Sequence, residues 1–227
     1  MNFRKTLALL GCAALMGTAS LSAQVKIKDG NKIAFMGDSI TQFGHNYAAG
    51  YVNMVMIGLK VNGIKADFVK AGISGNRSTH MLARLDRDVI SKKPQVMTLS
   101  CGVNDVWHEI SRQNGVDAKK FEQVYRMLLE WTRKELPETK IILLEPYVLP
   151  FGAVEPNWIP EMAERSRITE KMSKEFNTAY VPLQSLFNDA LKRAPQEYWL
   201  KDGVHPTLAG HKLISNAWLK AAEPYLQ

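Results

Sequence analysis

The sequence predicts an α/β fold, a three-layer α/β/α sandwich around a mostly parallel sheet of about five strands. Short apolar runs alternate along the chain with longer segments whose apolar residues recur every three or four positions. Parallel strands need crossover connections, so this alternation places helices on both faces of the sheet. Hydrophobic content of 46% and charged content of 22% over 227 residues are typical of a globular chain.

The first 23 residues are predicted to be a signal peptide, and residues 24–227 a single domain. A short basic front is followed by an uncharged, largely apolar stretch at 6–19 and then by small residues suited to cleavage. The apolar stretch is too short to span a bilayer comfortably. We therefore expect export to the periplasm or the outside of the cell. An N-terminal anchor helix and lipidation of Cys12 are the alternatives.

Five apolar runs are expected to form the strands, at 32–37, 66–72, 95–102, 140–148 and 178–183. The fifth is expected at an edge of the sheet, because Pro182 would interrupt a central ladder. Four segments with helical periodicity lie between or after these runs, at 50–63, 78–93, 117–136 and 161–176. The proline-rich stretch 149–160 is interpreted as an ordered loop, and two short helices are expected on either side of 202–206.

Polar turns that contain glycine follow the first three predicted strands, at 37–39, 72–76 and 102–105. The carboxyl ends of parallel strands share one edge of the sheet, which is where sites lie in such folds. A further polar loop, Asp-Gly-Val-His-Pro at 202–206, comes near the C-terminus. We expect these four segments to meet and to form the functional site.

Ser39, Asp202 and His205 are the candidate catalytic residues for acyl transfer. A serine hydroxyl is a weak nucleophile unless a base takes its proton, and His205 is the candidate base. Asp202 lies three residues before His205 and can fix the tautomer and orientation of the ring. The backbone N–H groups of Ser39 and Gly75 and the side-chain amide of Asn104 are candidate donors to an oxyanion.

The four motifs GDSITQ, GISGN, GVND and DGVHP resemble blocks I, II, III and V of the SGNH (GDSL-type) hydrolases. The resemblance covers essentially the whole chain after residue 23 and implies a flavodoxin-like sandwich. It implies that Ser39 is the nucleophile and that Asp202 and His205 complete the triad. It also implies that Gly75 and Asn104 are oxyanion-hole donors. Asp38, which precedes Ser39, is interpreted as holding the turn.

Three alternative sites have less support from the sequence than the Ser39 site. Ser74 in GISGN would suit an ordinary α/β-hydrolase, but that fold normally places its acid well before its histidine rather than in the same loop. The loop after the first strand has too few glycines to wrap a phosphate. Histidines that could bind a metal are scattered without ligand spacing; they are His45, His80, His108 and His211.

The predicted function is an exported serine esterase that cleaves short acyl esters, with acetyl groups on carbohydrate as the leading substrate. Five side chains are candidates for binding the sugar: Trp107, His108, Tyr147, Trp158 and Trp199. An acyl-thioesterase or lysophospholipase would keep the same mechanism with another acyl group. A glycan-binding protein without activity on the same scaffold is the alternative of a different class.

Partners and cofactors are constrained mainly by charge and cysteine content. The net charge of +7 is scattered along the chain without interleaved aromatics, so a nucleic-acid surface is not expected. Cleavage after residue 23 would leave Cys101 as the single cysteine, which excludes an internal disulfide and is expected to be a buried, inert thiol. No cofactor, no metal and no membrane span are expected in the processed chain. The sugar, the acyl group and the oligomeric state stay open.

Overall fold

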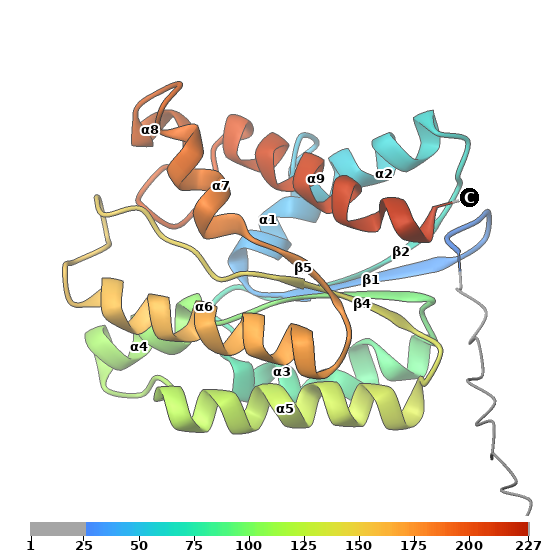
Figure 1. Ribbon diagram of the computed structural model, residues 1–227, viewed down its shortest axis with the longest axis horizontal. Helices are drawn as coiled ribbons and strands as arrows, with labels where there is room; N and C mark the ends of the chain where they lie inside the picture. The colour runs from blue at the N-terminus through green and yellow to red at the C-terminus, as the bar shows by residue number, and fades with distance from the viewer. Residues whose placement is uncertain (1–25, 227) are drawn as a thin grey trace, which may run out of the picture.

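The computed structural model describes residues 26–226, so the predicted signal peptide and Cys12 lie outside the described residues. The described chain contains a parallel sheet of five strands with helices on both faces, which confirms the predicted sandwich (Figure 1). The strand order is β2-β1-β3-β4-β5, with β5 at an edge as expected. The strands are β1 (Lys32–Gly37), β2 (Asp67–Gly72), β3 (Val96–Ser100), β4 (Lys140–Leu144) and β5 (Ala179–Val181).

The helices divide into two layers, one on each side of the sheet (Figure 1). The first layer contains α1 (Ser39–Asn46), α2 (Tyr51–Val61), α7 (Leu183–Ala190), α8 (Gln196–Trp199) and α9 (Leu208–Ala222). The second contains α3 (Ser78–Asp88), α4 (Val103–Arg112), α5 (Ala118–Glu135) and α6 (Trp158–Glu175). Two short 3₁₀ turns follow α3 and α9, at Ile90–Lys92 and Glu223–Tyr225.

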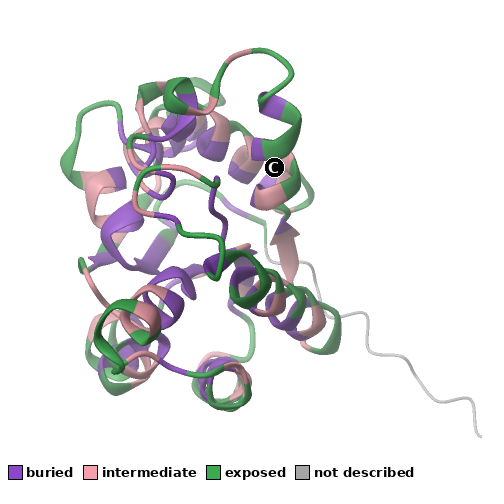
Figure 2. Cartoon of the chain, turned by 90° about the vertical axis from the view of Figure 1, so that its left-hand side faces the viewer, coloured by how far each residue is buried: buried purple, intermediate pink, exposed green. Residues whose placement is uncertain are grey.

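The alternation of side chains along the buried strands produces two hydrophobic cores, one under each helical layer. In β1, Ile33 and Phe35 belong to the core beneath α2 and α9, whereas Ala34 and Met36 belong to the core beneath α3 and α5. Successive strand residues point to opposite faces, so a strand covered on both sides must be apolar throughout. Figure 2 shows the same logic in the helices, whose buried residues face the interior and whose exposed residues face outward.

Several details differ from the sequence-based expectations. The helix α6 begins at Trp158, inside the stretch 149–160 that was expected to be a loop. Residues 103–112 form the helix α4, although the sequence pattern after Gly102 predicts only a turn. No side chain caps its start, but its apolar residues recur at helical spacing and pack in the core, so one of the two usual helix signals was present: Val103, Val106, Trp107 and Ile110. The predicted fourth strand ends at Leu144 rather than at residue 148. The helix after the 202–206 loop is not short, because α9 runs for 15 residues.

The strand order explains why the polar turns meet. β2 and β3 are the two neighbours of β1 in the sheet, so the turns that follow these three strands lie side by side. The register pairs Gly37 at the end of β1 with Gly72 at the end of β2. In the part of the chain that the structure describes, no helix combines the length and the apolar character needed to cross a membrane.

Candidate active site

Ser39, His205 and Asp202 form a continuous chain of hydrogen bonds at the carboxyl edge of the sheet. The Oγ of Ser39 lies 2.9 Å from Nε2 of His205, and Nδ1 of His205 lies 2.7 Å from Oδ2 of Asp202. The serine begins α1 directly after β1, whereas the other two residues come from the loop between α8 and α9. The fold thus joins the three predicted residues in the order nucleophile, base and acid, an arrangement able to move the serine proton to the ring.

The loop that carries Asp202 and His205, residues 200–206, is organised by the Asp202 carboxylate. Its Oδ1 accepts hydrogen bonds from the backbone N–H groups of Val204 and His205, at 3.0 and 2.8 Å, while its Oδ2 accepts from the His205 ring. Partial burial raises the pKa of Asp202, but these bonds outweigh it and hold the pKa below its ordinary value. A carboxylate that stays ionised can orient the ring and stabilise its charged form.

Gly203 allows the 200–206 loop to pack closely against the preceding proline-rich loop. Its φ of +87° is a backbone conformation that residues with a side chain rarely adopt. A Cβ at this position would also collide with the carbonyl oxygen of Phe151. The backbone of residues 149 and 153 also hydrogen-bonds to residues 203 and 202. The proline-rich loop therefore supports the segment that holds the histidine.

Asp38 has the structural role that the sequence indicated. Its Oδ1 accepts a hydrogen bond of 2.9 Å from the backbone N–H of Ile40 and so caps the start of α1. Complete burial raises its pKa to about 7, against the smaller opposing effects of the Ile40 bond and of the nearby His205. The Asp38 carboxyl group already occupies this helix terminus, where a phosphate would otherwise bind, and this argues against the phosphate-loop alternative.

The predicted oxyanion donors lie on the two turns that flank Ser39. Gly75 follows β2 with φ +75°, and a Cβ at this position would have only the Cε1 of His108 near it, at 3.9 Å. The glycine is therefore favoured by its backbone conformation rather than by crowding. Asn104 lies in the first turn of α4, is almost fully buried, and donates from Nδ2 to the backbone oxygen of Asn76 at 3.3 Å. Together with the N–H of Ser39, these groups come from the ends of β1, β2 and β3.

Sequence reasoning missed Arg84, a buried side chain that holds the turn after β2. From α3 it donates to Oδ1 of Asn76 at 2.7 Å and to the backbone oxygens of Ala71 and Gly37 at 2.9 and 3.0 Å. One guanidinium thus ties the ends of β1 and β2 to the turn that carries Gly75. The available signal was its position among the apolar residues of the helix face, where a solvent-exposed arginine would not be expected.

Asp105 fixes the other end of the same turn and was also missed. Its carboxylate accepts hydrogen bonds from the backbone N–H and the hydroxyl of Ser78, the first residue of α3. Burial raises the pKa of Asp105 to about 6, although its bonds to Ser78 act in the opposite direction. Asn104 and Asp105 are neighbours in the GVND motif, so one motif both presents an amide to the site and anchors the adjacent turn.

Aromatic rings surround His205, but not all of those expected. Trp107 is partly buried, with its ring centroid 5.9 Å from that of His205. Phe43, one helical turn after Ser39, has its ring centroid 5.7 Å from that of His205 and was not predicted. Its spacing of four residues from the serine places it on the same helix face, which is the signal that could have found it.

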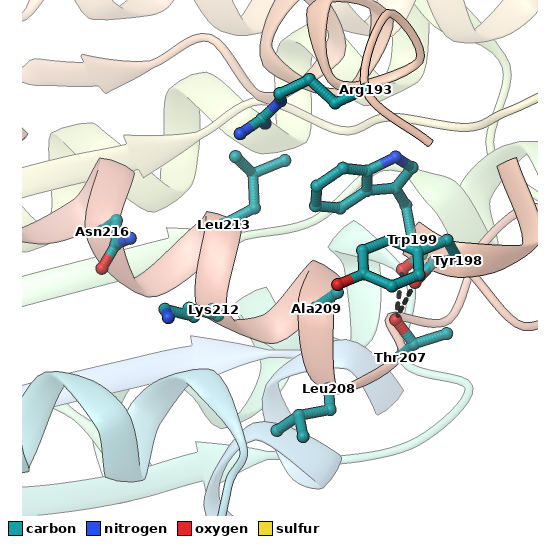
Figure 3. Close-up of a pocket in the computed structure, with 9 residues that line it drawn as sticks. All are labelled: Arg193, Tyr198, Trp199, Thr207, Leu208, Ala209, Lys212, Leu213 and Asn216. Carbon is teal, nitrogen blue, oxygen red and sulfur yellow. Dashed lines mark hydrogen bonds between the residues drawn. The ribbon is translucent and has the colours of Figure 1, made fainter. Parts of the chain in front are cut away.

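Three of the predicted sugar-binding aromatics require correction. Tyr147 and Trp158 are each 2% exposed, packed against Phe187 and Trp107 respectively, so their faces are not available to a ligand. Trp199 lines a separate pocket between α8 and α9 rather than the surroundings of Ser39 (Figure 3). His108 lies beside Gly75 and is partly exposed, which keeps it as a candidate.

The rival serine and the metal alternative gain no support from the described residues. Within residues 26–226 the serine that hydrogen-bonds to a histidine is Ser39, whereas Ser74 is held through its backbone N–H by Gln42. In the same range no cluster of three or more histidine, cysteine, aspartate or glutamate side chains is suited to a metal. Cys101 is buried as expected, and burial raises the pKa of its thiol, which is consistent with an inert group.

Comparison with known proteins decides the family. The family model for the GDSL-like Lipase/Acylhydrolase family matches residues 35–213, most of the chain. The chain belongs to this family. This GDSL-like chain is therefore a hydrolase of ester bonds, as the four motifs indicated.

Relatives of this GDSL-like hydrolase cover nearly its whole length. An acetylxylan esterase from Geobacillus stearothermophilus is 32% identical, over 86% of this chain and 95% of the relative. Thioesterase 1/protease 1/lysophospholipase L1 from Escherichia coli (strain K12) is 26% identical, over 85% of this chain and 83% of the relative. A crystal structure of a protein assigned to the GDSL-like lipases, from Parabacteroides merdae ATCC 43184, has a TM-score of 0.83 at 35% identity, and the match covers 88% of this chain and 99% of that one.

Proposed function

We propose that this chain is an exported serine esterase that removes short acyl groups, first of all acetyl, from carbohydrate esters. In this proposal the Oγ of Ser39 attacks the ester carbonyl while Nε2 of His205 takes its proton. The alcohol leaves with a proton returned by His205, and an acyl group stays on Ser39. A water molecule, activated by the same ring, then attacks this acyl-enzyme and releases the acid.

The observation that carries the proposal is the pair of hydrogen bonds through His205. The distances of 2.9 Å from Ser39 and 2.7 Å from Asp202 lie within the range for proton transfer and for orienting the ring. The backbone N–H groups of Ser39 and Gly75 and the Nδ2 of Asn104 would stabilise the negative charge that develops on the carbonyl oxygen. Each follows the end of a different strand, so the sheet would preorganise the three donors.

The carbohydrate part of the proposal has two supports. The relative at 32% identity is named as an acetylxylan esterase. Trp107, whose partly buried ring lies 5.9 Å from His205, could pack against the sugar that carries the ester. Export is supported by the signal-peptide pattern of residues 1–23.

The proposal is tested by hydrolysis of an aryl acetate by the wild type and by Ser39→Ala. Loss of the nucleophile should reduce kcat/KM by about 10³-fold or more. Ser74→Ala is the matched control, since it removes a hydroxyl from the neighbouring turn and should keep the wild-type rate. Equal rates for wild type and Ser39→Ala would overturn the proposal. Acetate release from acetylated xylan, pectin and mannan then identifies the carbohydrate.

A second candidate is a thioesterase or lysophospholipase, which the name of the Escherichia coli relative favours. The same triad would serve it, and only the acyl group would differ. A series of aryl esters from acetate to laurate separates the two, because a preference for long chains would contradict the acetylesterase. A glycan-binding protein without activity would instead bind acetylated glycan equally well with and without the Ser39 hydroxyl, and it would release no acetate.

A further inference from the structure

A pocket of about 610 Å³ lies between α8 and α9, beside the 200–206 loop and apart from the triad (Figure 3). Its walls come from the end of the segment after α7, from α8 and from the first turns of α9. Its charged and aromatic lining residues are Arg193, Tyr198, Trp199 and Lys212. Ser39, Asp202 and His205 do not line it, so the catalytic geometry does not explain the pocket.

The pocket is positively charged. Arg193 lines it from the segment after α7 and Lys212 lines it from α9. No acidic side chain is among its lining residues in the described chain. Within residues 26–226, neither cation forms an ion pair with a carboxylate. The acidic residues close to them in sequence have other partners, since Asp189 accepts from Lys192 at 2.7 Å and Glu197 from Gln196 at 3.3 Å. Lys192 lowers the pKa of Asp189, and Arg193 is close enough for its charge to contribute to this shift. Since neither pocket cation is paired with a carboxylate among the described residues, both can meet an anionic ligand.

The same pocket has an aromatic wall. The Arg193 guanidinium carbon lies 4.9 Å from the centre of the Trp199 ring, a cation–π contact that orients the guanidinium. Trp199 is 7% exposed, whereas Tyr198 is 56% exposed and stands edge-on to it at 4.9 Å. Tyr198 is therefore the more exposed ring of this wall, and it lines the same pocket as the two cations (Figure 3).

We propose that this pocket binds a sugar unit that carries a carboxylate, in an acidic oligosaccharide. The planar guanidinium of Arg193 suits a carboxylate, which it can bind through two parallel hydrogen bonds, and Lys212 adds a second charge. The exposed face of Tyr198 suits the apolar face of a sugar ring. The proposal rests on the proposed function and deepens it, because it makes an acidic polysaccharide the carrier of the ester.

The position of the pocket connects it to the catalytic loop. Residues 200–206 leave α8 and enter α9, the two helices that line the pocket. Thr207, at the start of α9, donates from Oγ1 to the backbone oxygen of Tyr198 at 2.6 Å and so joins both walls two residues after His205. A glycan chain held here would lie next to the loop that carries the base.

The test is a calorimetric titration with two probes of equal backbone length, plain xylotetraose and xylotetraose that carries one glucuronate. The protein is Ser39→Ala, which cannot turn over an ester. We expect the acidic probe to bind at least about tenfold more tightly than the neutral one, because only it can form the two charge-assisted contacts. This preference should weaken as salt is raised.

The double variant Arg193→Gln/Lys212→Gln should lose the preference for the acidic probe. Tyr198→Ala should weaken the binding of both probes. The matched control is Lys60→Gln/Lys220→Gln, which removes the same charge from exposed positions outside the pocket and should bind like the parent. Equal affinity of the parent for both probes, or no binding of the acidic one, would overturn the proposal. An equal loss in the control would also overturn it, because net charge alone would then explain binding.

The outcome is separable from that of the proposed function. Neither probe carries an ester, so the titration gives a result even if the wild type hydrolyses no aryl acetate. Conversely, the pocket variant should hydrolyse aryl acetate at the wild-type rate if the triad acts as proposed, since Arg193 and Lys212 do not touch Ser39 or His205.

Discussion

The His205 ring is oriented by Asp202 in its own loop, whereas the turn that carries Gly75 is fixed by side chains that also contact residues distant in the sequence. In the first, the Asp202 carboxylate binds backbone and ring within three residues. In the second, Arg84 and Asp105 reach across from α3 and α4. The orientation of the His205 ring is thus set within its own loop, and the groups expected to bind the oxyanion depend on the packing of the sheet and its helices.

The largest effect is expected from Asp202→Asn, which removes the carboxylate that orients the His205 ring. An amide there would present an N–H to the ring or favour the wrong tautomer, so kcat toward an aryl acetate should fall about 10⁴-fold while the fold persists. Asp189→Asn, which changes an exposed carboxylate paired with Lys192, should have no effect on kcat. A loss of less than tenfold in Asp202→Asn would mean that His205 does not depend on this partner.

Asn104→Ala tests the proposed oxyanion donors, whose positions depend on the packing of the sheet and its helices. Removing one oxyanion donor typically costs about 10² to 10³ in kcat with little change in KM. Asn114→Ala, an exposed amide just after α4, is the control and should behave as wild type. An increase in KM at constant kcat would instead assign Asn104 to substrate binding.

Asp38 is linked to both the His205 loop and the turn after β2, because its pKa is influenced by His205 and by Asp105. Because burial raises its pKa from 3.8 to about 7, the folded protein binds this proton more tightly than the unfolded chain. The native state should therefore lose stability as the pH rises from about 4 to 7, by up to about 4 kcal/mol from this group, with no further loss above pH 7.

Asp38→Asn should remove that dependence while keeping the cap on α1, since an asparagine oxygen can also accept from Ile40. Urea unfolding of wild type and variant at several pH values checks this. The difference in free energy of unfolding should grow in favour of the variant between pH 4 and 7. Parallel curves would show that Asp38 does not titrate differently in the two states.

Arg84→Met tests whether the turn after β2 is held from a distance. It removes buried charge-assisted hydrogen bonds to Asn76, Ala71 and Gly37, so the free energy of unfolding should fall by about 3 kcal/mol. Arg87→Met is a close control, because Arg87 binds the same Asp88 as Arg84 but its side chain is 73% exposed, and it should change stability by less than about 1 kcal/mol. Equal losses in the two variants would remove the special role of Arg84.

The sequence shows contacts between residues a few positions apart, but it does not show contacts that form only when distant elements pack together. Asp202 and His205 lie three residues apart, so a local pattern reveals their partnership, and the strand-end rule brings Ser39 to them. Arg84 and Gly37 lie 47 positions apart and come together only when α3 packs on the sheet, so no spacing in the sequence shows their contact. The aromatics illustrate the same limit, since the burial of Tyr147 and Trp158 depends on Phe187 and Trp107, which lie 40 and 51 positions away in the sequence.

Covalent labelling tests the role of Ser39 as the nucleophile. A fluorophosphonate probe reacts with an activated serine and stays attached, so digestion and mass spectrometry locate the site. We expect a single adduct on Ser39, which is absent from Ser39→Ala and forms much more slowly in His205→Ala. An adduct on Ser74, or hydrolysis of aryl acetate by a protein in which Ser39 remains unlabelled, would contradict it.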